Sequence, residues 1–197
     1  MLRSMKTTVQ KRILALFCDM HGAELIEFAV SLPLLIVFTM GIYDFSSAFI
    51  LKQKIAHVTE QAARVAANQP MSDVANTGSC PASICAIRDV VHQALTNNGV
   101  NDCGLRSVTP TNAALTWTFI ASNANCSGLT LIINRGVTYS VALPNPPFQG
   151  SYMVEATTVT LKYPYQWQFN KAINLIAPGA NYASGLIQSV ATMQNLD

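Results

Sequence analysis

The chain has 197 residues, of which 50% are hydrophobic and only 11% are charged, against a usual charged share of about 25%. This composition excludes a disordered protein, which needs low hydrophobicity and high charge. A net charge of +2 with no basic stripe argues against a nucleic-acid binder, and so few charges are unusual for a soluble cytosolic enzyme. The composition indicates a membrane-attached protein with a neutral, polar exterior domain.

The N-terminal segment 1–22 carries the excess positive charge, with two arginines and two lysines against Asp19. An uncharged, mostly apolar run follows from Phe28 to Tyr43. A membrane-spanning helix needs about 20 such residues, and basic flanks remain on the cytoplasmic side. We therefore predict a transmembrane helix over residues 23–44 with a cytoplasmic N-terminus. A buried core helix and a signal peptide cleaved after residue 48 are the alternatives.

The helical pattern continues beyond the span, because residues 45–67 contain neither Gly nor Pro. Asn68, Gln69 and Pro70 are typical of a helix end. The sequence therefore predicts a helical extension over residues 45–69 that projects from the membrane. Pro33 is expected to kink the spanning part, where neighbouring groups can satisfy the freed carbonyl.

The remaining residues, 70–197, are predicted to form an exterior domain. Apolar residues spaced as in a helix, after a proline suited to a first turn, indicate a second helix over 81–98.

Alternating and β-branched runs predict strands at 114–121, 129–134, 137–143 and 152–163, and 186–194 is a last strand or short helix. The link Asn134-Arg135-Gly136 is consistent with a hairpin, and prolines 144, 146 and 147 with a loop. The expected fold class is α+β, with the long N-terminal helix packed on a mainly antiparallel sheet.

Four of the five cysteines, Cys80, Cys85, Cys103 and Cys126, lie beyond the predicted span, on the side where disulfides persist. Four cysteines allow three pairings. Closure of short loops costs least, which favours Cys80 with Cys85 and Cys103 with Cys126. A zinc site is the rival interpretation, although no pair of these cysteines has zinc-finger spacing.

No catalytic constellation is found in the sequence. It lacks a nucleophile elbow, a phosphate loop, a zinc-protease motif and a dinucleotide fingerprint. His57 and His92 lie on predicted helices, where a histidine is usually an ordinary surface or half-buried residue. We therefore expect a protein that is not an enzyme and that holds no metal and no cofactor.

The junction MHGAELIEFAVSLPLLIVF resembles the processing signal of type IV pilin-like proteins, in which a basic leader ends in a glycine, here Gly22. The spacing from Gly22 to Glu27 and Phe28, the LPLL run and the later AARVAA segment are very similar to TadE-like minor pseudopilins of tight-adherence (Tad/Flp, type IVb-like) pilus systems. Two C-terminal stretches, 159–167 and 189–195, also resemble that family. The resemblance implies a pilin-like fold.

The resemblance further implies that a prepilin peptidase cuts between Gly22 and Ala23, and that Glu27 and Phe28 act in assembly. Expected partners are other pilin or pseudopilin subunits, the pilus assembly platform, the peptidase and membrane lipid, and no nucleic acid. The expected location is the bacterial inner membrane, with the C-terminal domain in the periplasm or at the cell surface. Alternatively, Glu27 interacts only with the N-terminus of its own helix.

Two functions of different classes follow. The first is a processed minor pseudopilin that takes part in assembly of a Tad/Flp pilus. The second is a permanently membrane-anchored exterior module that binds a ligand or wall component. Only the first requires the loss of residues 1–22.

Overall fold

The computed structural model describes residues 20–74, 80–124, 126–142, 150–169, 179 and 185–196, without the side chains of residues 20–23 and 127. The chain divides into two compact units, 1–46 and 47–197. Most of the predicted leader and the proline-rich loop at 144–147 lie outside the described residues. The predicted α+β class is confirmed by a long N-terminal helix and a five-stranded antiparallel sheet.

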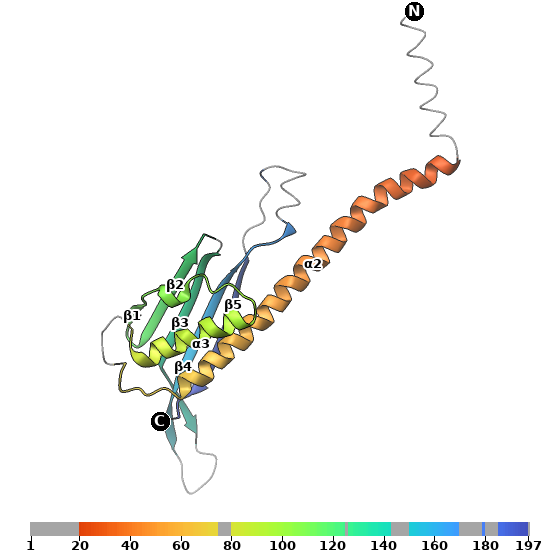
Figure 1. Cartoon of the computed structure of the whole chain (residues 1–197). Helices are drawn as coiled ribbons and strands as arrows, with labels where there is room; N and C mark the ends of the chain where they lie inside the picture. Colours follow the sequence, from red (N-terminus) through yellow and green to blue (C-terminus); the bar gives the residue numbers. More distant parts are fainter. Residues whose placement is uncertain are drawn as a thin grey trace, which may run out of the picture. The chain divides into compact units, whose positions relative to one another are not determined.

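The long helix α2 (Met20–Ala67) is continuous, with Pro33 inside it (Figure 1). Within the second unit, one face of α2 is fully buried at Ile55, Val58, Ala62 and Ala66. These positions are separated by three or four residues and therefore lie on one side of the helix. Alanines allow close packing here because their side chains are short.

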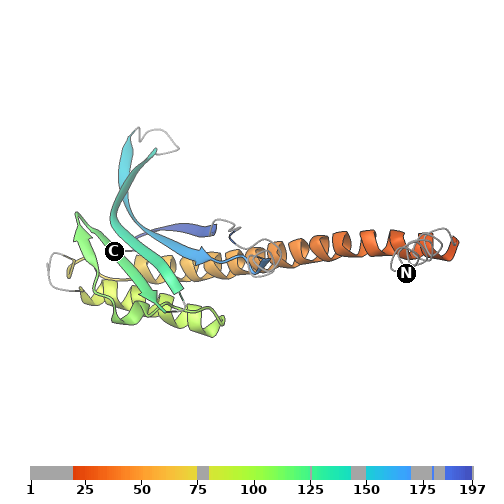
Figure 2. The same cartoon turned by 90° about the horizontal axis from the view of Figure 1, so that it is seen from above.

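The second helix, α3 (Ala82–Asn97), follows Pro81 as the sequence predicted, and a short 3-10 turn, η1 (Leu105–Ser107), comes after it. Ile84, Ile87, Val91 and Leu95 form the buried face of α3. These residues belong to the same core cluster as the buried face of α2. Figure 2 shows α3 and the outer half of α2 on the same side of the sheet.

The sheet has the strand order β1-β2-β3-β4-β5, with every neighbouring pair antiparallel. Its strands are β1 (Thr111–Ala113), β2 (Thr116–Asn123), β3 (Cys126–Ala142), β4 (Ser151–Tyr165) and β5 (Gly185–Gln194). Alternate residues supply the core, and the buried set includes Trp117, Phe119, Leu131, Ile133 and Leu161.

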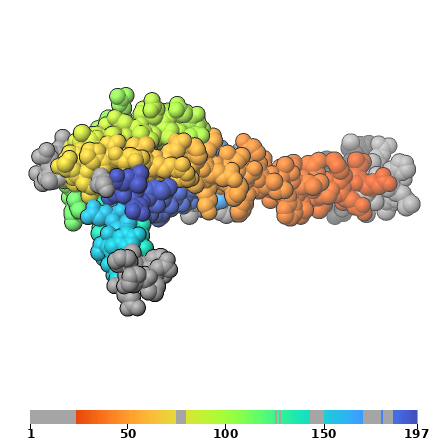
Figure 3. Space-filling view, turned by 90° about the horizontal axis from the view of Figure 1, so that it is seen from below, coloured from red at the N-terminus to blue at the C-terminus, as the bar shows by residue number. Residues whose placement is uncertain are grey.

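The sequence left residues 186–194 as either a last strand or a short helix, and the structure has a strand there, β5. It pairs with β4 and lies beside the outer half of α2, as Figure 3 shows in blue and yellow. Ile187, Ala191 and Met193 of β5 pack against the core. Just after β5, the Leu196 amide donates to the Ala67 carbonyl at the end of α2, at 3.1 Å.

The predicted hairpin at residues 134–136 is wrong. Residues 126–142 form one strand, and Asn134-Arg135-Gly136 is a bulge at which the register with β4 shifts. The Arg135 amide donates to the Leu115 carbonyl at 2.9 Å instead of closing a turn. A Cβ at Gly136 would lie 3.3 Å from the Leu115 Cβ, so the glycine permits this close approach.

The actual tight turn nearby is Ala114-Leu115, which the sequence assigned to the start of a strand. Ala113 pairs with Thr116, so these two residues alone connect β1 to β2. Both have positive φ angles, 45° and 61°. Such a turn normally contains Asn or Gly, and for this reason the sequence pattern did not reveal it.

Candidate functional site

The inner part of α2 presents its apolar side chains to the outside. Every described residue from Glu24 to Met40 is exposed. The helix Glu24–Ala67 contains an 18-residue window that is apolar enough to cross a membrane, and none of that window is buried. Exposed apolar surface on this scale is costly in water. This part of the helix is therefore suited to a lipid bilayer or to the interior of an assembly.

The polar side chains within this apolar segment bond to their own helix. Ser31 Oγ donates to the Phe28 carbonyl at 3.2 Å, and Thr39 Oγ1 donates to the Leu35 carbonyl at 2.8 Å. These two bonds satisfy the hydroxyls without water, as a hydrocarbon environment requires. Pro33 is an exception in the backbone: it has no N–H and leaves the Ala29 carbonyl without its usual helical donor.

The residues predicted to direct processing and assembly all lie near the start of α2. Gly22 and Ala23 are in its first turn, although their side chains are outside the described set. Glu27 and Phe28 follow, and both are exposed; Phe28 is 61% exposed. The structure therefore brings Glu27 within about two helical turns of the predicted cleavage point.

Two disulfides connect the elements of the second unit. Cys80 bonds to Cys85 beside the first turn of α3, and Cys103 bonds to Cys126 at the start of β3, with Cα separations of 5.8 and 5.3 Å. This is the pairing that short loops favoured. The second bond joins the segment after α3 to the sheet and closes the larger loop.

Arg135 is a buried structural residue that the sequence pattern did not reveal. Its side chain is 1% exposed, and its guanidinium donates to the carbonyls of Pro70 at 2.9 Å, Gln69 at 2.6 Å and Ala66 at 3.3 Å. A cation at a helix C-terminus is favoured by the helix dipole. Arg135 therefore fixes the end of α2 to the sheet, and a lone arginine within an apolar strand pattern was the available signal.

Asp73 performs the matching role at the start of α3. Its carboxylate accepts hydrogen bonds from the Ser83 amide at 2.7 Å and the Ser83 hydroxyl at 2.8 Å. Burial raises the pKa of this carboxyl, but the Ser83 bonds and the charge of Arg135 outweigh burial and hold the pKa below its ordinary value. The carboxylate is therefore ionised at neutral pH and caps the N-terminus of α3.

Residues 22–64 match the family model of TadE-like proteins, so the match begins at Gly22 and ends at Arg64 near the end of α2. It covers the exposed apolar segment and most of the buried outer half, and none of the sheet. No curated protein and no solved structure matches the chain. Over residues 22–64 the chain is therefore similar to TadE-like proteins, which supports an association with Tad pilus systems.

Proposed function

We propose that this protein is a minor pseudopilin, processed by a prepilin peptidase and taking part in assembly of a tight-adherence pilus. The observation that carries the proposal is an apolar helix exposed from Glu24 to Met40 in a segment that matches the TadE-like family from Gly22 onward. The function needs no catalytic group. The apolar helix holds the subunit in the inner membrane and then passes into the core of a filament.

The proposed orientation places residues 1–22 in the cytoplasm and the disulfide-containing domain outside. The basic leader supports this orientation, because lysines and arginines near a span remain on the cytoplasmic side. The two disulfides support it independently, since such bonds persist in an oxidising compartment. Proposed partners are other pilin subunits, the assembly platform and the peptidase.

Processing is tested by the intact mass of the protein purified from membranes of its own host. We expect the mass of a chain that begins at Ala23. The matched variant Gly22→Val should retain its leader, because a branched side chain at the cleavage point obstructs an extended backbone in a peptidase cleft. Wild-type protein that still carries Met1 while the peptidase is present would favour the permanently anchored exterior module.

Glu27 is the proposed assembly residue. An unpaired carboxylate within a span is costly, and Glu27 is exposed on α2 near the start of the predicted span. Cleavage would create a positive amine on Ala23. Contact between Glu27 of one subunit and the Ala23 amine of a neighbour is worth on the order of 4 kcal/mol at about 4 Å and an effective dielectric of about 20, before desolvation is subtracted. The contact would also fix the axial register between subunits.

The variant Glu27→Gln should insert and be cleaved normally, yet show reduced co-assembly with pilin subunits and impaired piliation. Glu24→Gln is the matched control, because Glu24 is also exposed and lies three residues earlier in the same helix. Crosslinking to co-expressed pilins and counting of pili by electron microscopy measure the effect. Normal piliation by Glu27→Gln would indicate that Glu27 interacts only with the N-terminus of its own helix.

A further inference from the structure

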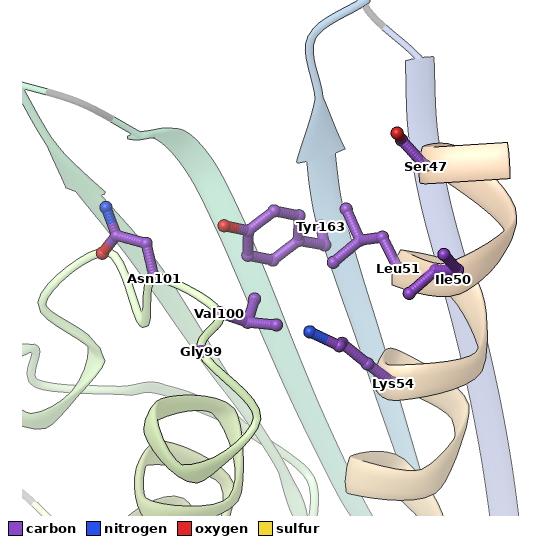
Figure 4. Close-up of a pocket in the computed structure, with 8 residues that line it drawn as sticks. All are labelled: Ser47, Ile50, Leu51, Lys54, Gly99, Val100, Asn101 and Tyr163. Atoms are coloured by element: carbon purple, nitrogen blue, oxygen red, sulfur yellow. The ribbon is translucent and has the colours of Figure 1, made fainter. Parts of the chain in front are cut away.

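A cavity of about 310 Å³ lies within the second unit, between α2, the loop that follows α3 and strand β4. Figure 4 shows its walls: α2 on one side, the loop that follows α3 on the other, and Tyr163 of β4 between them. The lining residues are Ser47, Ile50, Leu51, Lys54, Gly99, Val100, Asn101 and Tyr163. Its volume is at the lower end of the usual range for small-ligand sites, about 300–1,000 Å³.

Among the described residues that line the cavity, one carries a positive charge and none is a carboxylate. Lys54 supplies the ammonium, and Ser47, Asn101 and Tyr163 supply neutral hydrogen-bond donors. Lys54 Nζ donates to the Asn98 carbonyl at 2.7 Å, which uses one of its three N–H groups. This bond holds the half-buried lysine in place beside the cavity, so its charge is positioned before any ligand arrives.

The carboxylate of Asp102 is close to the cavity but does not line it. Its Oδ2 is paired with His92 Nδ1 at 2.8 Å, and its Oδ1 accepts from the Gly104 amide at 3.3 Å. Burial, and secondarily the Asp102 charge, raise the pKa of Tyr163 above its ordinary value. Tyr163 is therefore a neutral phenol at physiological pH and can donate its O–H to an anion.

We propose that this cavity binds the phosphate of an anionic phospholipid headgroup. The Lys54 ammonium pairs with the phosphate, Tyr163 and Asn101 donate to its oxygens, and Ile50 and Leu51 contact the glycerol and upper acyl carbons. A charge-assisted bond of this kind is about twice as strong as a neutral one. The site would bind a single lipid at the exterior surface of the membrane.

A lipid is the favoured source of the phosphate because of where the cavity lies on α2. Its first lining residue, Ser47, is four residues beyond Tyr43, at the end of the uncharged run. Phe49 and Ile50, on the same part of the helix, are 61% and 50% exposed. Apolar exposure next to a lysine is the pattern that membrane surfaces bind. The inference needs only membrane anchoring, so it can fail while leader cleavage is still observed.

The test uses the full chain in nanodiscs and counts retained lipid by native mass spectrometry. The probes are phosphatidylglycerol, phosphatidylcholine and inorganic phosphate. The variant Lys54→Gln is compared with Lys52→Gln, because Lys52 is exposed and does not line the cavity. Wild type and Lys52→Gln should retain phosphatidylglycerol in preference to phosphatidylcholine. Lys54→Gln should bind phosphatidylglycerol about tenfold more weakly, as expected for one lost bond to a charged group.

Tyr163→Phe provides an independent arm that keeps the packing of the ring, and it should weaken retention of phosphatidylglycerol several-fold with an unchanged Tm. If inorganic phosphate displaces phosphatidylglycerol at low millimolar concentration, the cavity is a phosphate site. Its ligand would then be the free anion and not a lipid. Equal retention of the two lipids, or equal retention by Lys54→Gln and Lys52→Gln, would overturn the proposal.

Discussion

The two halves of α2 use their apolar side chains in opposite ways. From Glu24 to Met40 every side chain is exposed, whereas Ile55, Val58 and Ala62 in the outer half are completely buried in their own domain. A helix that is apolar on all sides is stable only when something surrounds it. The outer half is covered by the chain itself, whereas the exposed apolar surface of the inner half is suited to lipid or to the interior of an assembly.

The difference is visible in the residue types. The inner half is rich in Leu, Ile, Val and Phe around its whole circumference. The outer half has alanines on the buried face and charged residues such as Glu60 and Arg64 on the exposed face, where they form an i,i+4 pair. Substitutions that remove support from the second unit should consequently leave membrane insertion unchanged.

The largest effect is expected from loss of the Cys103–Cys126 disulfide. The two cysteines are 23 residues apart, and chain entropy predicts a loss of about 3 kcal/mol of unfolding free energy in a Cys103→Ser, Cys126→Ser variant. For Cys80 and Cys85, five residues apart, the expected loss is about 2 kcal/mol. Denaturant unfolding in detergent, followed by fluorescence of the buried Trp117, measures both. A larger cost for the shorter loop would contradict the entropic explanation.

Arg135→Met should cost about 3 kcal/mol, because it removes charged hydrogen bonds and leaves the carbonyls of Gln69 and Pro70 without this donor. Arg106→Met is the matched control: Arg106 is exposed, and its replacement should change the unfolding free energy by less than about 0.5 kcal/mol. The same fluorescence measurement applies. Equal stability of the two variants would contradict the proposed role of Arg135 in stabilising the C-terminal end of α2.

Ala63→Leu and Ala29→Leu compare the two halves directly. Ala63 is 0% exposed, so a larger side chain should overpack the core and cost about 1–3 kcal/mol. Ala29 is exposed in the apolar half, and leucine there should leave the unfolding of the second unit unchanged. Thermal unfolding of both variants in the same detergent measures the stability of the second unit in each. A destabilised Ala29→Leu domain would show that the two halves are not independent.

The smallest effect concerns pH. The pKa of Asp73 is below its ordinary value of 3.8 in the folded protein, so the unfolded state takes up a proton more readily. The contribution of this carboxylate is complete above pH 3.8 and is lost as pH falls through the lower folded pKa. Asp73→Asn should therefore reduce the loss of stability below about pH 4. Denaturant titrations between pH 7 and pH 3 compare the slopes, and identical slopes would exclude this role.

Local patterns in the sequence were sufficient for the helices, including the long apolar one. The apolar run from Phe28 to Tyr43 and the helical spacing after Pro81 are properties of neighbouring residues, and the structure has helices at both. The pairing of Cys80 with Cys85 also follows from closeness in the chain. The family resemblance rested on the segment from Gly22 to the AARVAA run, which the family model matches as far as Arg64, and on residues 159–167 and 189–195, which lie outside that match.

Only the tertiary structure decided the role of residues 134–136. Asn, Arg and Gly in succession are typical of a turn, yet Arg135 reaches carbonyls that are more than 60 residues away in the chain. The cavity beside Lys54 likewise combines residues from α2, the loop after α3 and β4. Sequence periodicity reports which face of an element is apolar. It contains no information on which distant carbonyl or phenol a charged side chain will meet, because chain folding sets those distances.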